Sequence, residues 1–140
     1  MERLLGRFEP HLFALLRIVA GLMFALHGTQ KLLGWPEARP MRQLPPLIMT
    51  AGLIETVGGL MIALGLFGSI AAFICSGQMA VAYFWRHAPD GFWPTVNKGE
   101  LAVLYCFLFL FIAAYGSGIW SIDSLRRGAA GRREKAETWH

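Results

Sequence analysis

The sequence predicts an all-α integral membrane protein, folded as a four-transmembrane-helix bundle. Charged residues make up only 16% of the chain and apolar residues 55%, whereas about 25% of the residues in an ordinary soluble domain are charged. Residues 101–119 form a run of 19 residues without a single charge, which is typical of a membrane-spanning helix. Because the apolar runs are continuous and show no two-residue alternation, they predict helices and not the strands of a barrel.

Four apolar segments account for the predicted helices: residues 12–33, 47–67, 70–85 and 101–119. Each can cross the ~30 Å of hydrocarbon in a bilayer, the third by including Gly68 and Ser69. The connection between the first two segments contains four prolines and cannot continue a helix. We therefore expect one membrane domain over residues 1–125, followed by a basic cytoplasmic tail over residues 126–140 that is partly disordered.

The distribution of Lys and Arg predicts the orientation in the membrane. The side that holds both termini carries seven of these residues, and the opposite side carries five. Basic residues favour the cytoplasmic side, so we expect both termini to be cytoplasmic in a multi-pass protein. Most of the net charge of +4 follows the last apolar run, where basic residues typically contact anionic lipid. The expected partner is thus the lipid bilayer, and nucleic-acid binding is not expected.

A few polar side chains interrupt the apolar runs, and each is a candidate functional residue because burying it in a membrane is costly. At 1.5 Å per residue, His27 lies about 22 Å along the first helix, and Glu55 lies about 12 Å from the outer end of the second. We predict an intramembrane polar cluster in the outer half of the bilayer that handles a ligand or a proton, formed by His27, Gln30, Lys31, Glu55 and Glu100. A purely structural clasp is an equally good interpretation. Gln78 is a further polar residue in these runs, without an assigned role.

Two other polar residues are predicted to form a structural pair. Arg17 lies about 8 Å from the cytoplasmic end of the first helix, and Asp123 follows the fourth helix on the same side. The two cysteines, Cys75 and Cys106, are placed about 10 Å apart in depth, which is too far for a disulfide. The four histidines are scattered, so no metal site is expected. The catalytic residues are unknown, because no catalytic motif is present.

Short motifs recur along the chain in a specific order: Leu16-Arg17, His27-Gly28-Thr29-Gln30-Lys31-Leu32, Gly52-Leu53-Ile54-Glu55, Gly58-Gly59, Leu64-Gly65-Leu66, Met79-Ala80-Val81-Ala82-Tyr83, His87, Gly91-Phe92-Trp93-Pro94, Asn97-Lys98-Gly99-Glu100, Gly116-Ser117-Gly118 and Trp120-Ser121-Ile122-Asp123. In order and spacing this pattern resembles the DoxX family of small four-helix bacterial membrane proteins, over about residues 12–125. The segment 116–118 reads Gly-Ser-Gly where the family usually has Gly-Pro-Gly. The family's recurrent polar positions fall on Arg17, His27, Lys31, Glu55, Glu100 and Asp123.

The resemblance implies a protein of the bacterial cytoplasmic (inner) membrane that serves as the membrane subunit of a redox or oxidative-stress system. Such a subunit would interact with quinone or with a membrane-associated oxidoreductase, although no cofactor motif is evident in the chain. One alternative is a non-enzymatic assembly factor or scaffold for a partner membrane protein. Another is a small-molecule transporter, which with four helices would need a homodimer. Homo-oligomerisation is left open by the sequence.

Overall fold

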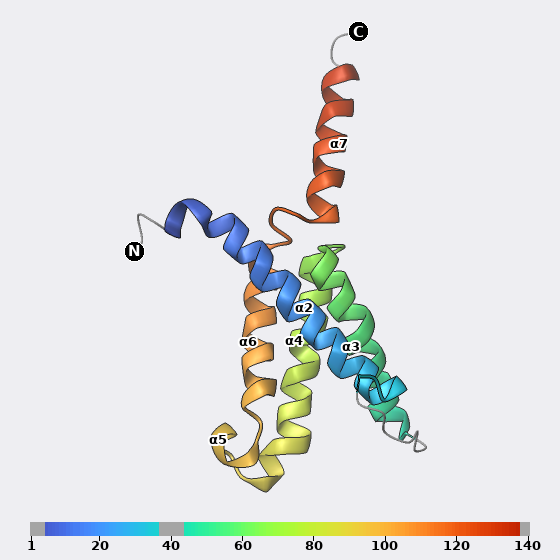
Figure 1. Cartoon of the computed structure of the whole chain (residues 1–140), viewed down its shortest axis with the longest axis vertical. Helices are drawn as coiled ribbons and strands as arrows, with labels where there is room; N and C mark the ends of the chain where they lie inside the picture. The colour runs from blue at the N-terminus through green and yellow to red at the C-terminus, as the bar shows by residue number, and fades with distance from the viewer. Residues whose placement is uncertain (1–4, 37–43, 138–140) are drawn as a thin grey trace.

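The computed structural model describes residues 5–36 and 44–137, with side chains as far as Ala130. The elements follow one another in the order η1 (Gly6–Phe8), α2 (Glu9–Leu33), α3 (Pro46–Leu64), α4 (Gly68–Ala82), the π-helical turn η2 (Tyr83–His87), η3 (Ala88–Asp90), α5 (Pro94–Asn97), α6 (Glu100–Tyr115) and α7 (Ile122–Glu137). Within these ranges the chain has no strand. Figure 1 shows α2, α3, α4 and α6 gathered into a bundle, with both termini at one end and α7 projecting from that end.

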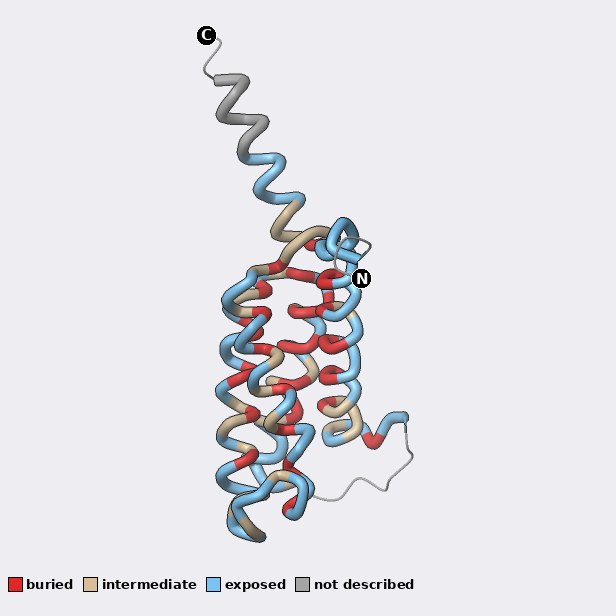
Figure 2. The backbone as a smooth tube through the Cα atoms, turned by 90° about the vertical axis from the view of Figure 1, so that its left-hand side faces the viewer, coloured by how far each residue is buried: buried red, intermediate tan, exposed pale blue. Residues whose placement is uncertain are grey.

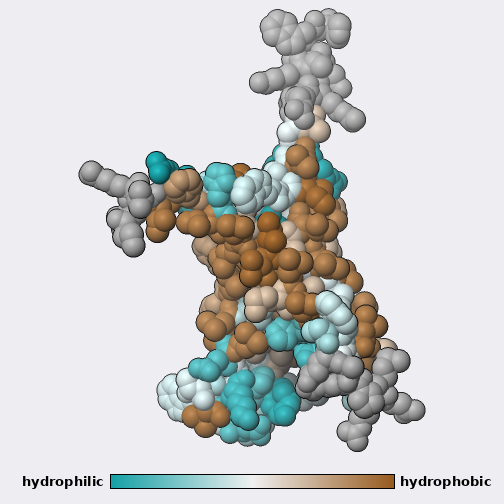
Figure 3. Space-filling model, viewed as in Figure 1, coloured by the Kyte–Doolittle hydropathy of each residue, from teal (hydrophilic) through white to brown (hydrophobic). Residues whose placement is uncertain are grey.

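The surface of the bundle is apolar, as expected for a protein embedded in lipid. Large side chains such as Phe73, Leu104 and Phe107 are 66%, 67% and 66% exposed, and apolar residues form a broad band between two more polar ends (Figure 3). Three stretches are long and apolar enough to cross a membrane, namely Gly6–Leu33, Pro46–Leu64 and Gly68–Asp90. The chain is therefore a helical, membrane-embedded protein.

The fourth apolar helix is shorter than the sequence predicts. It runs from Glu100 to Tyr115, which gives a length of about 24 Å at 1.5 Å per residue. The helix stops at Gly116, whose φ of +94° breaks the helical path, and residues 116–121 continue as a loop. Because this helix is shorter than the hydrocarbon core, the count of four membrane crossings stays a prediction.

Two other boundaries differ from the expected ones for local reasons. α3 ends at Leu64 and not at residue 67, because Gly65 adopts a left-handed conformation at φ +63° that glycine adopts at little steric cost. α7 replaces most of the tail that was expected to be partly disordered. Its first turn is capped by Ser121, whose Oγ accepts the N–H of Ser124 at 3.1 Å, a favourable start for a helix.

Small residues bring α2 and α3 into backbone contact. In Figure 2 the buried positions lie on the sides of the helices that face into the bundle. A Cβ atom at Gly21 would lie 2.6 Å from the carbonyl oxygen of Gly59 and from the nitrogen of Ala63. A Cβ atom at Gly59 would in turn lie 2.6 Å from the nitrogen of Ala25. Such close approach by small residues is the usual way in which helices pack in lipid.

A larger side chain at the α2–α3 contact should separate the two helices. We expect Gly59→Val to destabilise the protein by about 1–3 kcal/mol, because the added atoms meet main-chain atoms that cannot rotate away. Thermal or detergent-induced unfolding of the purified protein measures this. Gly77→Ala is the control, since a Cβ there meets nothing within 4 Å. Equal stability of the two variants would show that this contact does not hold the bundle together.

Candidate functional site

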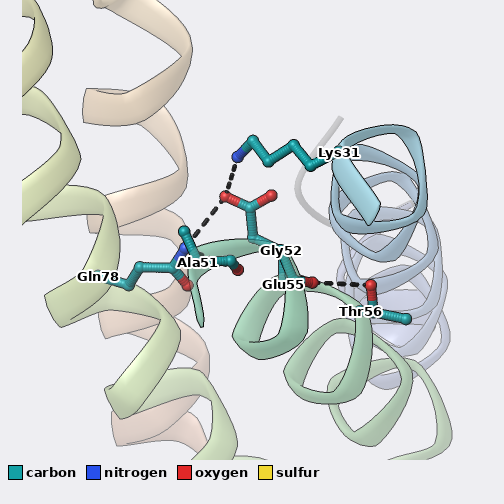
Figure 4. A network of polar contacts seen from close by, with 6 residues as sticks. All are labelled: Lys31, Ala51, Gly52, Glu55, Thr56 and Gln78. Carbon is teal, nitrogen blue, oxygen red and sulfur yellow. Dashed lines mark hydrogen bonds and ion pairs between the residues drawn. The ribbon is translucent and has the colours of Figure 1, made fainter. Parts of the chain in front are cut away.

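Three helices contribute to a polar cluster formed by Lys31 of α2, Glu55 of α3 and Gln78 of α4 (Figure 4). The Lys31 Nζ donates to Glu55 Oε1 in an ion pair. The Gln78 Nε2 donates to the same oxygen at 3.0 Å and to the carbonyl of Ala51 at 3.2 Å. The Glu55 side chain is 2% exposed and that of Lys31 is 37% exposed, so a buried carboxylate is paired with a cation that reaches the surface.

The packing of α2 on α3 explains why these side chains meet. Glu55 is one turn after Gly52 on α3, and a Cβ at Gly52 would lie 3.3 Å from the Cβ of Lys31. The absence of a side chain at Gly52 thus leaves room for the Lys31 stem beside α3. An ion pair in a low-dielectric interior needs such close geometry, because both charges have lost hydration.

Two atoms of the cluster have no hydrogen-bond partner among the described residues: Glu55 Oε2 and Gln78 Oε1, both buried. Both are oxygen atoms that can accept a hydrogen bond. Nearly all buried polar atoms in proteins are hydrogen-bonded, so two unpaired acceptors in one cluster require an explanation. The cluster has the chemistry to receive hydrogen-bond donors from outside the chain.

The structure brings together only part of the predicted cluster. His27 is half-buried and its ring lies 6.2 Å from that of Tyr105 on α6. Glu100 is exposed at the start of α6. Within the described part of the chain, neither has a hydrogen bond or ion pair to Glu55. Gln30 is half-buried beside Lys31 on α2, and its main-chain carbonyl accepts the N–H of Gly34 at 3.2 Å.

Gln78 is the residue of the cluster for which the sequence analysis predicted no role. An amide within an apolar helix is an available signal, because it needs partners when it is buried. The sequence does not show which helix supplies those partners. In the structure α3 supplies them, through Ala51 and Glu55.

The predicted pair of Arg17 and Asp123 is wrong as a direct contact. Arg17 is fully buried, and its guanidinium donates to the carbonyls of Ile62 at 2.5 Å, Ala63 at 2.7 Å and Trp120 at 2.8 Å. These carbonyls lie at the end of α3 and in the loop after α6, where a helix no longer supplies donors to all of its carbonyls. The Ile62 carbonyl also accepts the N–H of Gly65 at 3.1 Å. Arg17 therefore joins α2 to the end of α3 and to the loop after α6 through main-chain oxygens, and the charge of Asp123 acts on it only at longer range.

Asp123 instead binds the start of α4. Its carboxylate accepts the N–H groups of Phe67 and Gly68, each at 3.0 Å, and the Ser117 hydroxyl at 2.6 Å. Partial burial alone would raise the pKa of Asp123, but these hydrogen bonds and the charge of Arg127 hold it below its ordinary value. The carboxylate is thus ionised and stabilised by the N-terminus of a helix.

A second set of polar residues fixes the turn between α4 and α6, and these residues are hydrogen-bonded within the chain. The buried Asn97 donates to the carbonyl of Gly91 at 2.6 Å and accepts the N–H of Gly99 at 2.8 Å. The ring of His87 lies 3.1 Å from the carbonyl of Asn97 through Nδ1, and the Tyr83 hydroxyl donates to the carbonyl of Phe92. These bonds shape the turn, so we assign these residues a structural role.

The cysteines are free, as predicted, but the depth argument for this was wrong. The Ser76 hydroxyl of α4 donates to the carbonyl of Cys106 on α6 at 2.7 Å, which places Cys75 and Cys106 at a similar level. Their side chains lie on different faces, since the Cys75 sulfur packs against Gly58 of α3. No group of three or more His, Cys, Asp or Glu in the described ranges is arranged to hold a metal ion.

Removing the lysine of the ion pair should destabilise the protein because it strands a buried carboxylate. We expect Lys31→Ala to lower the free energy of unfolding by about 1–3 kcal/mol. The double variant Lys31→Ala/Glu55→Gln should recover most of this loss, since it removes the uncompensated charge. Unfolding in mild detergent measures both. Arg86→Ala is the matched control, because it breaks an exposed ion pair with Asp90 and should change stability by less than about 1 kcal/mol. A double variant no more stable than Lys31→Ala would contradict this account.

Comparisons with known proteins agree with the resemblance seen in the sequence. Residues 12–88 match the family described as DoxX. An uncharacterized protein of Haemophilus influenzae (strain ATCC 51907 / DSM 11121 / KW20 / Rd) is 44% identical over 126 residues, which cover 86% of this chain and 94% of the relative. No solved structure matches the chain. The family match extends over more than half of the sequence, from α2 to the π-helical turn η2, and the chain belongs to the DoxX family.

Proposed function

We propose that this chain is the membrane subunit of a redox or oxidative-stress system, and that the cluster of Lys31, Glu55 and Gln78 binds the headgroup of a reduced quinone. The observation that supports this is the pair of buried, unpartnered acceptors, Glu55 Oε2 and Gln78 Oε1. A structural clasp would be expected to satisfy its own polar atoms. This cluster leaves two of them without a partner among the described residues.

The residues fit the reduced form of a quinone better than the oxidised form. A quinol carries two hydroxyl donors and supplies two electrons and two protons, whereas a quinone offers only carbonyl acceptors. Two unpaired acceptor oxygens can bond to hydroxyl groups and not to carbonyls. In this proposal, Glu55 Oε1 stays paired with Lys31, and Oε2 accepts a hydroxyl hydrogen bond or takes up a proton from the quinol.

The electrons need a partner protein, because the sequence holds no cofactor motif. A membrane-associated oxidoreductase is therefore part of the proposal, with this chain binding the quinol and handling its protons. The Lys31 side chain is partly exposed. It therefore connects the buried carboxylate of Glu55 with the protein surface near the C-terminal end of α2. Such a connection lets a proton leave the membrane interior on that side.

Glu55→Gln is the variant that tests this proposal. It keeps the shape of the side chain and can still accept a hydrogen bond, but it cannot ionise or hold a proton. We expect the unmodified chain, purified in mild detergent, to bind a short-tailed ubiquinol analogue more tightly than the oxidised analogue. We expect Glu55→Gln to fold and to bind the ubiquinol at least about tenfold more weakly, because it loses a hydrogen bond to a charged group. Equilibrium binding monitored by tryptophan fluorescence measures both affinities.

Asp90→Asn is the matched control, since Asp90 is an exposed carboxylate near the same end of the bundle. It should bind the ubiquinol as the unmodified chain does. Equal binding by Glu55→Gln and the unmodified chain, or no binding by either, would rule out the quinol site. A stoichiometric protein partner that co-purifies without quinone would then favour an assembly factor or scaffold.

The same proposal includes residence in the bacterial inner membrane with both termini in the cytoplasm. Both ends of the described chain lie at one end of the bundle (Figure 1), and that end carries most of the basic residues. We expect a single cysteine introduced after Ala130, with Cys75 and Cys106 replaced, to resist a membrane-impermeant thiol reagent applied to intact cells. Labelling of that cysteine from outside would reverse the orientation.

A further inference from the structure

A cavity of about 300 Å³ lies where α4 begins and α7 leaves the bundle. It is lined by Phe67, Ser69, Ile70, Ser117, Asp123, Arg126 and Arg127. Lys31 and Glu55 lie toward the other end of the bundle, so this cavity is independent of the proposed quinol site. It combines two guanidinium groups with an apolar wall at the end of the membrane-embedded helices.

The two arginines of the cavity are available to a ligand. Both are exposed and lie in the first two turns of α7. Within the described ranges, neither guanidinium has a hydrogen bond or an ion pair. Arg126 lies over the Phe67 ring, 4.9 Å from its centre, and Arg127 contributes a longer-range attraction to Asp123. Arginine offers five N–H donors in a planar fork that matches phosphate oxygens.

Asp123, the acidic residue of the cavity, is already satisfied. Its oxygens accept two main-chain N–H groups at the start of α4 and the Ser117 hydroxyl. Its negative charge is thus offset by the helix N-terminus. The lining therefore keeps two guanidinium groups whose hydrogen-bond donors are not used within the described ranges, although Arg126 contacts the Phe67 ring and Arg127 attracts Asp123.

The apolar wall distinguishes a lipid from a free ion. Phe67 is 49% exposed and Ile70 is 62% exposed beside the arginines. A free anion gains nothing from such surface, whereas a phospholipid carries a phosphate and acyl chains together. Basic pockets between membrane helices are known to suit anionic headgroups. We propose that this cavity binds an anionic phospholipid, with Arg126 and Arg127 on its phosphate and Phe67 and Ile70 against its glycerol and acyl carbons.

Native mass spectrometry of the full chain in mild detergent, titrated with phosphatidylglycerol, tests the site. The double variant R126Q/R127Q should bind this lipid roughly tenfold more weakly than the unmodified chain. The matched control is R132Q/R133Q, which removes the same charge from the same helix further along. It should keep the affinity of the unmodified chain. Phosphatidylcholine, which has no net charge, should bind all three proteins weakly.

Four results would overturn the proposal. Unchanged binding by R126Q/R127Q would exclude the cavity, and an equal loss in R132Q/R133Q would show that total charge acts in its place. Displacement of phosphatidylglycerol by millimolar inorganic phosphate would identify a free-anion site. If R126Q/R127Q does not fold, R126K/R127K gives the same comparison, because it keeps the charge and removes the forked donors. It should then bind more weakly than the unmodified chain, and equal affinity would refute the arginine contacts.

Discussion

The backbone contact between α2 and α3 is the constraint on which the other arrangements depend. Gly21 and Gly59 let the two helices approach until main-chain atoms touch. Gly28 of α2 and Gly52 of α3 extend the same contact toward the C-terminal end of α2. In lipid the hydrophobic effect does not press helices together, so close packing of small residues carries much of the association. The short distance between α2 and α3 also brings Lys31 within reach of Glu55. A wider spacing would leave the carboxylate without its cation.

Arg17 and Glu55 are buried charged residues near the two ends of the α2–α3 contact, and their hydrogen-bond partners differ in kind. Near the cytoplasmic end in the proposed orientation, Arg17 bonds to carbonyls at the end of α3 and in the loop after α6. Main-chain oxygens need hydrogen-bond donors inside a membrane, so Arg17 stabilises the fold. At the other end, Glu55 and Gln78 leave acceptors without a partner. Arg17 also keeps one unpaired atom, its Nε, whereas both unpaired atoms at Glu55 and Gln78 are acceptors. We assign Arg17 a structural role and propose that the second arrangement receives a ligand or a proton.

The two proposed sites lie apart in the structure but have one property in common. Each holds polar groups that have no hydrogen-bond partner among the described residues. At the Lys31–Glu55 level the free groups are acceptors, which suits hydroxyl donors. At the α4–α7 end they are guanidinium donors, which suit phosphate oxygens. Because the two chemistries are complementary, the sites are expected to select different molecules from the same membrane.

The sequence by itself determined the membrane class and the approximate place of the apolar helices, because hydropathy over a long run is a local property. It also identified Lys31 and Glu55, since an ionisable residue in an apolar run stands out wherever it faces. Only the tertiary structure decided their partners. Gln78 joins Glu55 because α4 packs on α3, while His27 turns toward Tyr105 of α6. Arg17 binds carbonyls and not Asp123, and Gly116 ends α6 early. These outcomes depend on the rotation of each helix about its axis and on main-chain groups that every residue carries, so side-chain identity alone could not reveal them.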